Sequence, residues 1–398
     1  MLDGDTEGTV AFAIDFSDLA SNAGTQVTEL ESDADGSGVT FDKTAPSFTT
    51  GSGASISISS DNADNTVAIL SNTITLQLTS TEPIKSGSNP VVTINGNNAT
   101  VTRNTSQSFT ATYQMSDSDG SDDIASIPFS VSSYEDLVGN TGATVASTTD
   151  GSAVKYDPTA PTLSNVAMVS VNTNNSAYAK EDDVIRLTFE SSETINTPTI
   201  SFLGSTADIT LTQPQANSWQ VEKTVASGHA ETEAEFSITF SDLAGNAGVN
   251  SSGGTVVSTL TDGNTLVTVD RTTPSVTTVD IATNNWIDSN EDNIQDADEL
   301  NPQYATPGNL ITLTITTDEA IQEPAVTIGS NVAPTVAEVD GFDKKKWTAT
   351  HTAGNVETLG QMSFLIDFTD LASNDGVDHN TILNVTIHAV SYHGISFY

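Results

Sequence analysis

The chain has 398 residues and a formal net charge of −41, from 11 Lys and Arg against 52 Asp and Glu. So acidic a surface repels phosphate backbones and anionic lipids, which argues against nucleic-acid binding and against docking on membranes. Cysteine is absent, which removes disulfides, thiolate metal sites and cysteine nucleophiles. No run of 18 apolar residues predicts a membrane span. An acidic surface is, however, suited to holding divalent cations.

Short segments of alternating apolar and polar residues recur along the whole chain, and period-two alternation is typical of antiparallel strands with one buried face. In chain order the predicted strands include 12–16, 73–80, 127–131, 184–190, 236–240, 310–316 and 364–368. Tyr134 stands one residue out of phase with Val131, which predicts a β-bulge. About seven short strands per 110 residues predict an all-β fold of tandem immunoglobulin-like β-sandwich domains in an extended array.

Two short phrases repeat in a fixed order. The first is a loop after an alternating strand, and its copies are Asp18-Leu-Ala-Ser-Asn22, Asp136-Leu-Val-Gly-Asn140, Asp242-Leu-Ala-Gly-Asn246 and Asp370-Leu-Ala-Ser-Asn374. The second, Asp-x-Thr-x-Pro, begins at Asp42, Asp157 and Asp270. The spacings between these three aspartates are 115 and 113 residues, which is the length of one domain rather than of a solenoid turn.

The Asp-x-Thr-x-Pro phrases therefore mark the predicted domain boundaries. We expect the C-terminal part of an immunoglobulin-like domain at 1–41 and complete domains at 42–156, 157–269 and 270–398. The first unit lacks its front half, and we expect the chain to be a piece of a longer protein.

These motifs resemble those of the tandem bacterial immunoglobulin-like repeats found in large calcium-binding cell-surface adhesins and biofilm proteins. The resemblance rests on the Asp-x-Thr-x-Pro linker, a Ser/Asp-Glu near the end of an early strand, and the Asp-Leu-Ala-Gly-Asn loop, and it covers nearly the whole chain. The last repeat departs from the pattern, since 390–398 carry no Asp-x-Thr-x-Pro phrase. The resemblance implies surface exposure and a role in adhesion or spacing, and it implies no particular receptor.

In a sandwich of this topology, three acidic positions of each domain meet at the end where the chain enters. They are the linker aspartate, a glutamate that follows strand B, and the aspartate that opens the loop between strands F and G. The predicted sets are Asp42, Glu82 and Asp136; Asp157, Glu193 and Asp242; and Asp270, Glu319 and Asp370.

Three carboxylates at one tip repel one another unless a cation lies among them, and calcium accepts six to eight oxygen ligands with loose geometry. The sequence therefore predicts calcium at each domain entry, where it would stiffen the joint. The alternative is that the aspartates cap turns through their side chains, as Asp does in many loops.

A second candidate calcium site is the acidic stretch 288–299, which matches the twelve-residue EF-hand loop. The predicted ligands are Asp288, Asn290, Asp292, the carbonyl of Ile294, Asp296 and Glu299. Position 6 of the loop is Asn293 instead of Gly, which tolerates a left-handed backbone at some cost. No helix clearly precedes the stretch, so we expect a calcium loop inserted between strands; the alternative is a solvated acidic loop.

Weaker acidic clusters, at 117–123 and at 182–183, are either further ligands or plain solvated turns. The five histidines have no metal-ligand spacing, and no Gly-x-Ser-x-Gly or phosphate-binding loop occurs, so we do not expect an enzyme.

The expected function is mechanical: a calcium-rigidified, extracellular repeat region at the cell surface that extends or displays an adhesive tip. The expected partners are calcium ions, neighbouring copies of the chain, and a cell-surface or glycan ligand. Two alternatives stay open. One is a subunit of a surface filament, in which the incomplete first unit is completed by a neighbour's strands. The other is a glycan-binding module that uses Tyr178, Trp286 and Tyr304.

Overall fold

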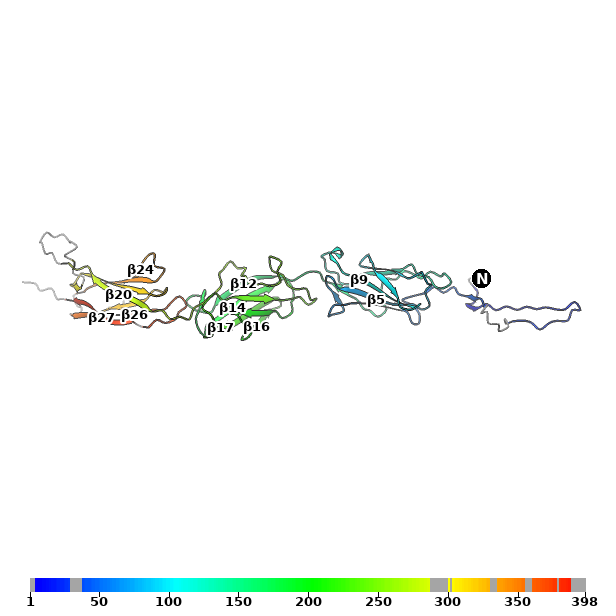
Figure 1. Ribbon diagram of the computed structural model, residues 1–398, viewed down its shortest axis with the longest axis horizontal. Helices are drawn as coiled ribbons and strands as arrows, with labels where there is room; N and C mark the ends of the chain where they lie inside the picture. The colour runs from blue at the N-terminus through cyan, green and yellow to red at the C-terminus, as the bar shows by residue number, and fades with distance from the viewer. Residues whose placement is uncertain are drawn as a thin grey trace, which may run out of the picture. The chain divides into compact units, whose positions relative to one another are not determined.

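Figure 1 shows the computed structural model of the chain, of which residues 4–28, 38–286, 300, 303–329, 335–354, 360–377 and 379–387 are described. The chain forms two compact units: unit 1 is Met1–Ala160 with Ser241–Ala247, and unit 2 is Pro161–Phe240 with Gly248–Tyr398. Within the described residues the one helical element is a 3₁₀ turn, and no helix is long and apolar enough to cross a membrane.

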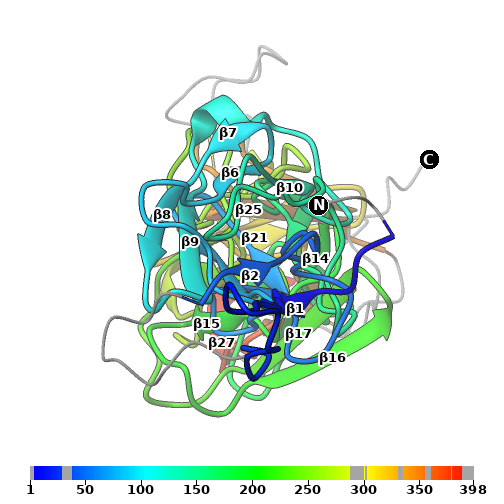
Figure 2. The ribbon, with the colours of Figure 1, turned by 90° about the vertical axis from the view of Figure 1, so that its right-hand side faces the viewer.

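Unit 1 contains one complete sandwich and a short antiparallel pair ahead of it. Its elements are β1 Gly8–Thr9, β2 Thr40–Phe41, β3 Ser55–Ser60, β4 Val67–Ala68, β5 Thr73–Thr79, β6 Val91–Ile94, β7 Asn97–Asn98, β8 Thr100–Arg103, β9 Ser108–Gln114, the 3₁₀ turn η1 Asp117–Asp119, β10 Phe129–Ser132 and β11 Lys155–Tyr156. The sheet β3-β5-β9-β8 has the immunoglobulin order A-B-E-D, and β10-β6-β7 supplies strands F and C of the facing sheet. Figure 2 shows β8 beside β9.

Unit 2 repeats this topology in two further sandwiches. They are called the third and fourth, because the incomplete first unit of the sequence counts as the first and the complete sandwich of unit 1 as the second. The third sandwich has β12 Leu163–Ser170, β13 Tyr178–Ala179, β14 Val184–Ser191, β15 Thr199–Phe202, β16 Thr210–Gln215, β17 Ser218–Thr224, β18 Phe236–Thr239 and β19 Thr268–Val269. The fourth has β20 Val276–Thr283, β21 Tyr304–Ala305, β22 Leu310–Thr317, β23 Ala325–Ile328, β24 Thr335–Glu338, β25 Lys346–Thr352, β26 Gly360–Asp367 and β27 His379–Ile387. The A-B-E-D sheets are β12-β14-β17-β16 and β20-β22-β25-β24. The prediction of tandem immunoglobulin-like sandwiches is confirmed.

The alternation of residues in strand B shows why the chain folds in this way. In β5, Ile74, Leu76 and Leu78 point into the core and pair with residues of β9, so that Leu78 lies opposite Phe109. Burying each such side chain stabilises the fold by about 1.5–3 kcal/mol. The predicted strands 73–80, 184–190 and 310–316 are observed as β5, β14 and β22, with ends shifted by no more than a residue.

The described part contains three hydrophobic clusters, and the residues of each fall within one of the predicted domains 42–156, 157–269 and 270–398. The domain boundaries at 42, 157 and 270 stay predictions. The extra residue before Tyr134 is accommodated at Ser133, whose φ of 55° turns the chain so that Tyr134 enters the core with 1% exposure.

Candidate metal centre

The loop after strand F is built around its first aspartate. Oδ1 of Asp136 accepts the backbone N–H groups of residues 138, 139 and 140 at 2.9, 2.7 and 2.9 Å, and Oδ2 accepts the side-chain amide of Asn140 at 2.7 Å. The loops at Asp242 and Asp370 have the same Asn-to-Asp contacts. The aspartates therefore do cap the turn, and Oδ2 of Asp136, with one bond, keeps a second lone pair.

The fourth position of this loop has a left-handed backbone. Its φ is 102° at Gly139, 101° at Gly245 and 69° at Ser373. A β-branched or bulky residue is strained there, which explains why only Gly and Ser occur at this position in the four copies.

The linker aspartate and the glutamate are held by equally local contacts. The backbone N–H of Thr272 donates to Oδ1 of Asp270 at 3.2 Å, and the same bond occurs in the linkers at Asp42 and Asp157. A hydroxyl two residues before each glutamate donates to that glutamate's carbonyl at 2.5–2.6 Å, from Ser80, Ser191 and Thr317. These bonds fix the backbone and leave the carboxylates to point toward the tip.

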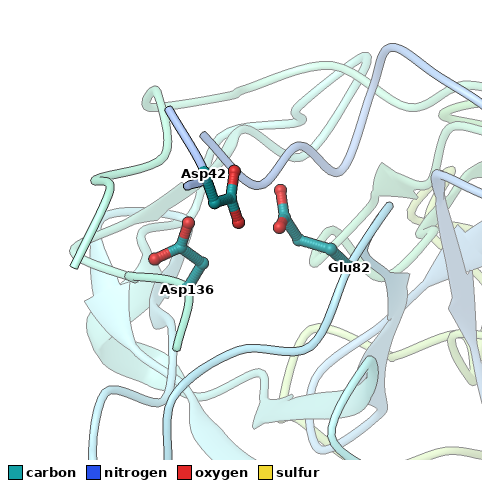
Figure 3. Close-up of side chains that lie close together, drawn as sticks. All are labelled: Asp42, Glu82 and Asp136. Atoms are coloured by element: carbon teal, nitrogen blue, oxygen red, sulfur yellow. The ribbon is translucent and has the colours of Figure 1, made fainter. Parts of the chain in front are cut away.

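The structure brings the predicted acidic residues together. In unit 1, one carboxylate oxygen from each of Asp42, Glu82 and Asp136 lies within 4.8 Å of the others, and Figure 3 shows the three side chains converging. In unit 2, Asp270, Glu319 and Asp370 converge within the same distance. Asp136 and Asp370 are buried, with 1% and 0% exposure, so each cluster contains one carboxylate that is shielded from water.

The remaining predicted set is divided between the two units. Asp157 and Asp242 belong to unit 1, where their carboxylates lie within 4.8 Å, and Asn246 donates both to the carbonyl of Asp157 and to Asp242. Burial, the nearby Asp242 and Asp123 together raise the pKa of Asp157. Glu193 belongs to unit 2, where it follows β14.

The three carboxylates of the fourth-sandwich cluster repel one another, so the electrostatics there favour binding of a positive charge. Burial, followed by repulsion from Asp270 and Asp370, raises the pKa of Glu319 to about 7. Burial and the neighbouring Asp370 also raise the pKa of Asp270, and burial raises that of Asp370. Oε1 of Glu319 is buried, and no group among the described residues donates a hydrogen bond to it. A buried oxygen without a donor costs about 1–3 kcal/mol, and a cation would supply what is missing.

In the unit 1 cluster the pKa shifts do not all have the same direction. Burial, Asp42 and Asp136 raise the pKa of Glu82. In contrast, burial raises the pKa of Asp136 less than the bonds from Asn140 and the loop backbone lower it, so that its pKa lies below the ordinary value.

Sequence reasoning assigned no role to the asparagine that ends the loop. Asn374 donates its side-chain amide to the carbonyl of Asp270 at 2.9 Å, Asn246 donates to Asp157 at 2.9 Å, and Asn140 donates to Asp42 at 3.4 Å. The loop is thus hydrogen-bonded directly to the linker backbone. Recurrence of Asn in all four copies was the available signal.

An acidic residue ahead of strand F accepts a bond from the linker threonine. Asp123, in the predicted cluster 117–123, accepts it from Thr159 at 3.4 Å, whereas sequence reasoning did not single out its counterparts Glu7 and Glu231. Thr44 donates its hydroxyl to Glu7 at 2.6 Å, and Thr272 donates to Glu231 at 2.8 Å. Glu231 lines an open hollow of about 460 Å³ together with Asp270 and Glu319. A further carboxylate therefore faces the cluster from the preceding part of the chain.

A third missed feature is an aromatic ring stacked over a glycine. The ring stands two residues before the loop aspartate and the glycine two residues after the asparagine. A Cβ on Gly248 would lie 2.2 Å from the ring of Phe240, and Gly142 and Gly376 are equally close to Tyr134 and Phe368. The glycine lets the ring close the core beneath the loop.

Other predicted positions are explained differently or are not described. The stretch 288–299 lies outside the described residues. Asp119 accepts bonds from the side chains of Asn95, Asn97, Tyr113 and Ser116, which is a structural role. Tyr178 and Tyr304 occupy the equivalent strands β13 and β21, each pairing in parallel with the last strand of its sandwich, and Tyr304 is 38% exposed.

No protein-family model matches the chain, and no curated protein matches it. Solved structures of tandem immunoglobulin domains are similar to it at low identity. A titin I-band fragment, I67–I69, is 10% identical with a TM-score of 0.34, covering 84% of this chain and 99% of its own. The ectodomain of mouse nectin-like molecule 4 is 9% identical with a TM-score of 0.26, covering 83% and 99%. A fragment of the ICAM-5 ectodomain, D1–D4, is 13% identical with a TM-score of 0.26, covering 84% and 77%. The fold assignment stands on the strand order described above.

Proposed function

We propose that this chain is a calcium-stiffened repeat region that works outside the cell, extending or displaying an adhesive surface. The observation that carries the proposal is the convergence of a linker aspartate, a strand-B glutamate and a loop aspartate at equivalent positions of the sandwiches. In the fourth sandwich a Glu319 oxygen in this cluster is buried and, within the part of the chain that the structure describes, receives no hydrogen bond.

The donor set fits calcium. All three side chains offer hard carboxylate oxygens at mutual distances within 4.8 Å, and calcium tolerates irregular ligand arrangements that magnesium does not. In the fourth sandwich, Asp270, Glu319 and Asp370 would hold the ion, which would supply positive charge where three carboxylates repel one another. A net charge of −41 adds a general attraction for cations.

The cluster lies where a bound cation would connect the entry linker to the folded sandwich. Asp270 belongs to the segment through which the chain enters the sandwich, whereas Glu319 and Asp370 belong to loops of the sandwich itself. An ion bound by all three would join the linker to the folded domain and restrict its rotation. Extracellular modules bind calcium at about 10⁻⁴–10⁻³ M, which suits millimolar calcium outside cells. The resemblance to bacterial surface adhesins supports the same location and role.

Small-angle scattering and calorimetry of the whole chain, in excess calcium and again in chelator, test the proposal. We expect a longer, stiffer particle and a higher Tm in calcium, and a smaller response to magnesium at the same concentration. Scattering and melting curves that are identical in calcium and chelator would leave the repeats as spacers with acidic turns.

A second candidate function is a filament subunit completed by strands of a neighbouring chain. The observation that favours it is the bare apolar face of the first unit. Ile14 and Phe16 are 53% and 55% exposed, whereas the equivalent Ile238 and Phe240 are 0% and 8% exposed in the third sandwich. Strands from another copy could cover this face.

Sedimentation velocity across a concentration series tests this second function. Strand exchange predicts concentration-dependent polymers that Phe16→Ser abolishes, while Phe342→Ser, a change at another exposed phenylalanine, leaves them intact. A monomer at every concentration rules it out.

A further inference from the structure

The side chains of Asn62 and Asn172 make the same set of contacts in two different sandwiches. Each lies in the loop after the first strand, β3 or β12, and each backbone N–H is capped by the serine hydroxyl two residues earlier, at 3.1 and 3.0 Å. Each side-chain oxygen accepts the backbone N–H two residues later, at 3.2 and 3.0 Å. The amide is therefore held in one orientation by its own loop.

The side-chain NH₂ then bonds in two directions. One bond stays within the sandwich: Asn62 donates to Asn72 at 3.0 Å, and Asn172 donates to Asp183 at 3.0 Å. The other bond reaches a backbone carbonyl in the Asp-Leu-Ala-x-Asn loop of the following repeat. Asn62 donates to Ala244 at 3.0 Å, and Asn172 donates to Ala372 at 2.6 Å. Only a primary amide of this length supplies both donors and the acceptor.

The alanines whose carbonyls accept this bond are buried. Ala244 and Ala372 are 6% and 0% exposed, whereas Val138, at the same loop position but without such a contact from any described asparagine, is 60% exposed. In unit 2 the contact is reinforced, because Asn174 donates to the hydroxyl of Ser373 at 3.0 Å. A small residue at the third loop position allows the close approach; the loop that carries valine there, Val138, receives no such asparagine contact from the described residues.

We propose that Asn62 and Asn172 are docking residues, through which one sandwich recognises the Asp-Leu-Ala-x-Asn loop of the next. The contact uses no carboxylate of the acidic clusters, so in unit 2 it orients the third and fourth sandwiches whether or not a cation is bound. It also touches the loop that ends in the cluster: Asp370 lies two residues from Ala372. Docking and cation binding order the same five residues and therefore favour each other; this coupling rests on the proposed calcium function.

Pulsed electron paramagnetic resonance measures the docking directly. The chain has no cysteine, so Thr210→Cys in β16 and Ala337→Cys in β24, both exposed, take spin labels selectively. In chelator we expect a narrow distance distribution for the otherwise unchanged chain and a clearly broadened one for Asn172→Asp, which loses both donors. Asn175→Ala is the matched control, because among the described residues the side chain of Asn175 bonds within its own loop, accepting the backbone N–H of Ala177.

Ala372→Val tests the same contact from the other side. The loop of the second sandwich already carries valine at this position, so the substitution is compatible with the loop fold, yet we expect the same broadening. Equal widths in chelator for the parent, Asn172→Asp and Ala372→Val would overturn the docking proposal.

Isothermal titration of calcium into the parent and into Asn172→Asp separates this proposal from the proposed function. If both hold, Asn172→Asp raises the calcium dissociation constant by about fivefold or more. A parent distribution that is narrow in chelator, together with no calcium binding in the titration, would sink the calcium function and leave the docking role standing.

Discussion

The side-chain amide of Asn374 donates to the backbone carbonyl of Asp270 at 2.9 Å, across 104 positions of the sequence. The same amide donates to Oδ2 of Asp370 at 2.7 Å. One side chain thus joins the entry linker to the loop after strand F. Both aspartates belong to one acidic cluster, so the asparagine positions two of its three carboxylates.

Asn374→Ala removes both bonds while Asp370 stays buried. We expect the free energy of unfolding to fall by about 1–3 kcal/mol, because a buried carboxylate loses a donor. Chemical denaturation measures this loss. Asn22→Ala is the matched control, since Asn22 occupies the same loop position but bonds an exposed Asp18. Equal effects of the two substitutions would contradict a special role for the linker contact.

The raised pKa of Glu319 sets a pH dependence. Its pKa is about 7 in the folded chain against an ordinary 4.5, so the folded state binds more protons. Its contribution to stability is fully present below about pH 4.5 and is lost as the pH rises through about 7. In chelator we therefore expect Tm to fall between about pH 5 and 8, and calcium to suppress the fall. Melting curves at several pH values test this; a Tm that rises across this window in chelator would be the wrong sign.

Glu319→Gln should have opposite effects with and without calcium. Without calcium it removes repulsion among three carboxylates, so we expect a higher Tm at pH 7.5. With calcium at about 10 mM, one site at the affinity of extracellular modules adds about 1.4–2.7 kcal/mol of stability, and the variant should lack most of this gain. Differential scanning calorimetry in both conditions measures whether the Tm difference between variant and parent changes sign. Glu323→Gln, at an exposed glutamate outside the cluster, is the control and should follow the parent.

Gly248→Ala should destabilise the third sandwich. Its Cβ would lie 2.2 Å from the ring of Phe240, so the ring must move, and overpacking of this kind costs about 1–3 kcal/mol. Gly228→Ala is the control, because open space surrounds that position and its change should stay within about 0.5 kcal/mol. Urea denaturation compares the two. Similar losses for both would mean that the ring and the glycine are not closely packed.

The sequence alone was sufficient for most of the strands, although the predicted strand 12–16 forms only an isolated bridge at Ile14, and for the acidic residues that meet in the described clusters. Strand B and its trailing glutamate could be read because burial alternates with period two, which is a local property of the chain. The recurrence of Asp42, Asp157 and Asp270 at domain-length spacing predicts where the linkers lie, since a repeated fold places repeated residues alike. Topology then predicted that linker, glutamate and loop aspartate meet, and the described clusters in both units have this geometry.

What only the tertiary structure decided is how these residues are held and how much charge they feel. The pKa of Glu319 depends on burial and on Asp270 and Asp370, which are remote in sequence. The bond from Asn172 to Ala372 spans 200 positions, and nothing local to either residue encodes it. Hydrogen-bond partners and desolvation arise from the packing of distant segments, so periodicity and spacing locate the acidic tips but do not reveal the amides that position them.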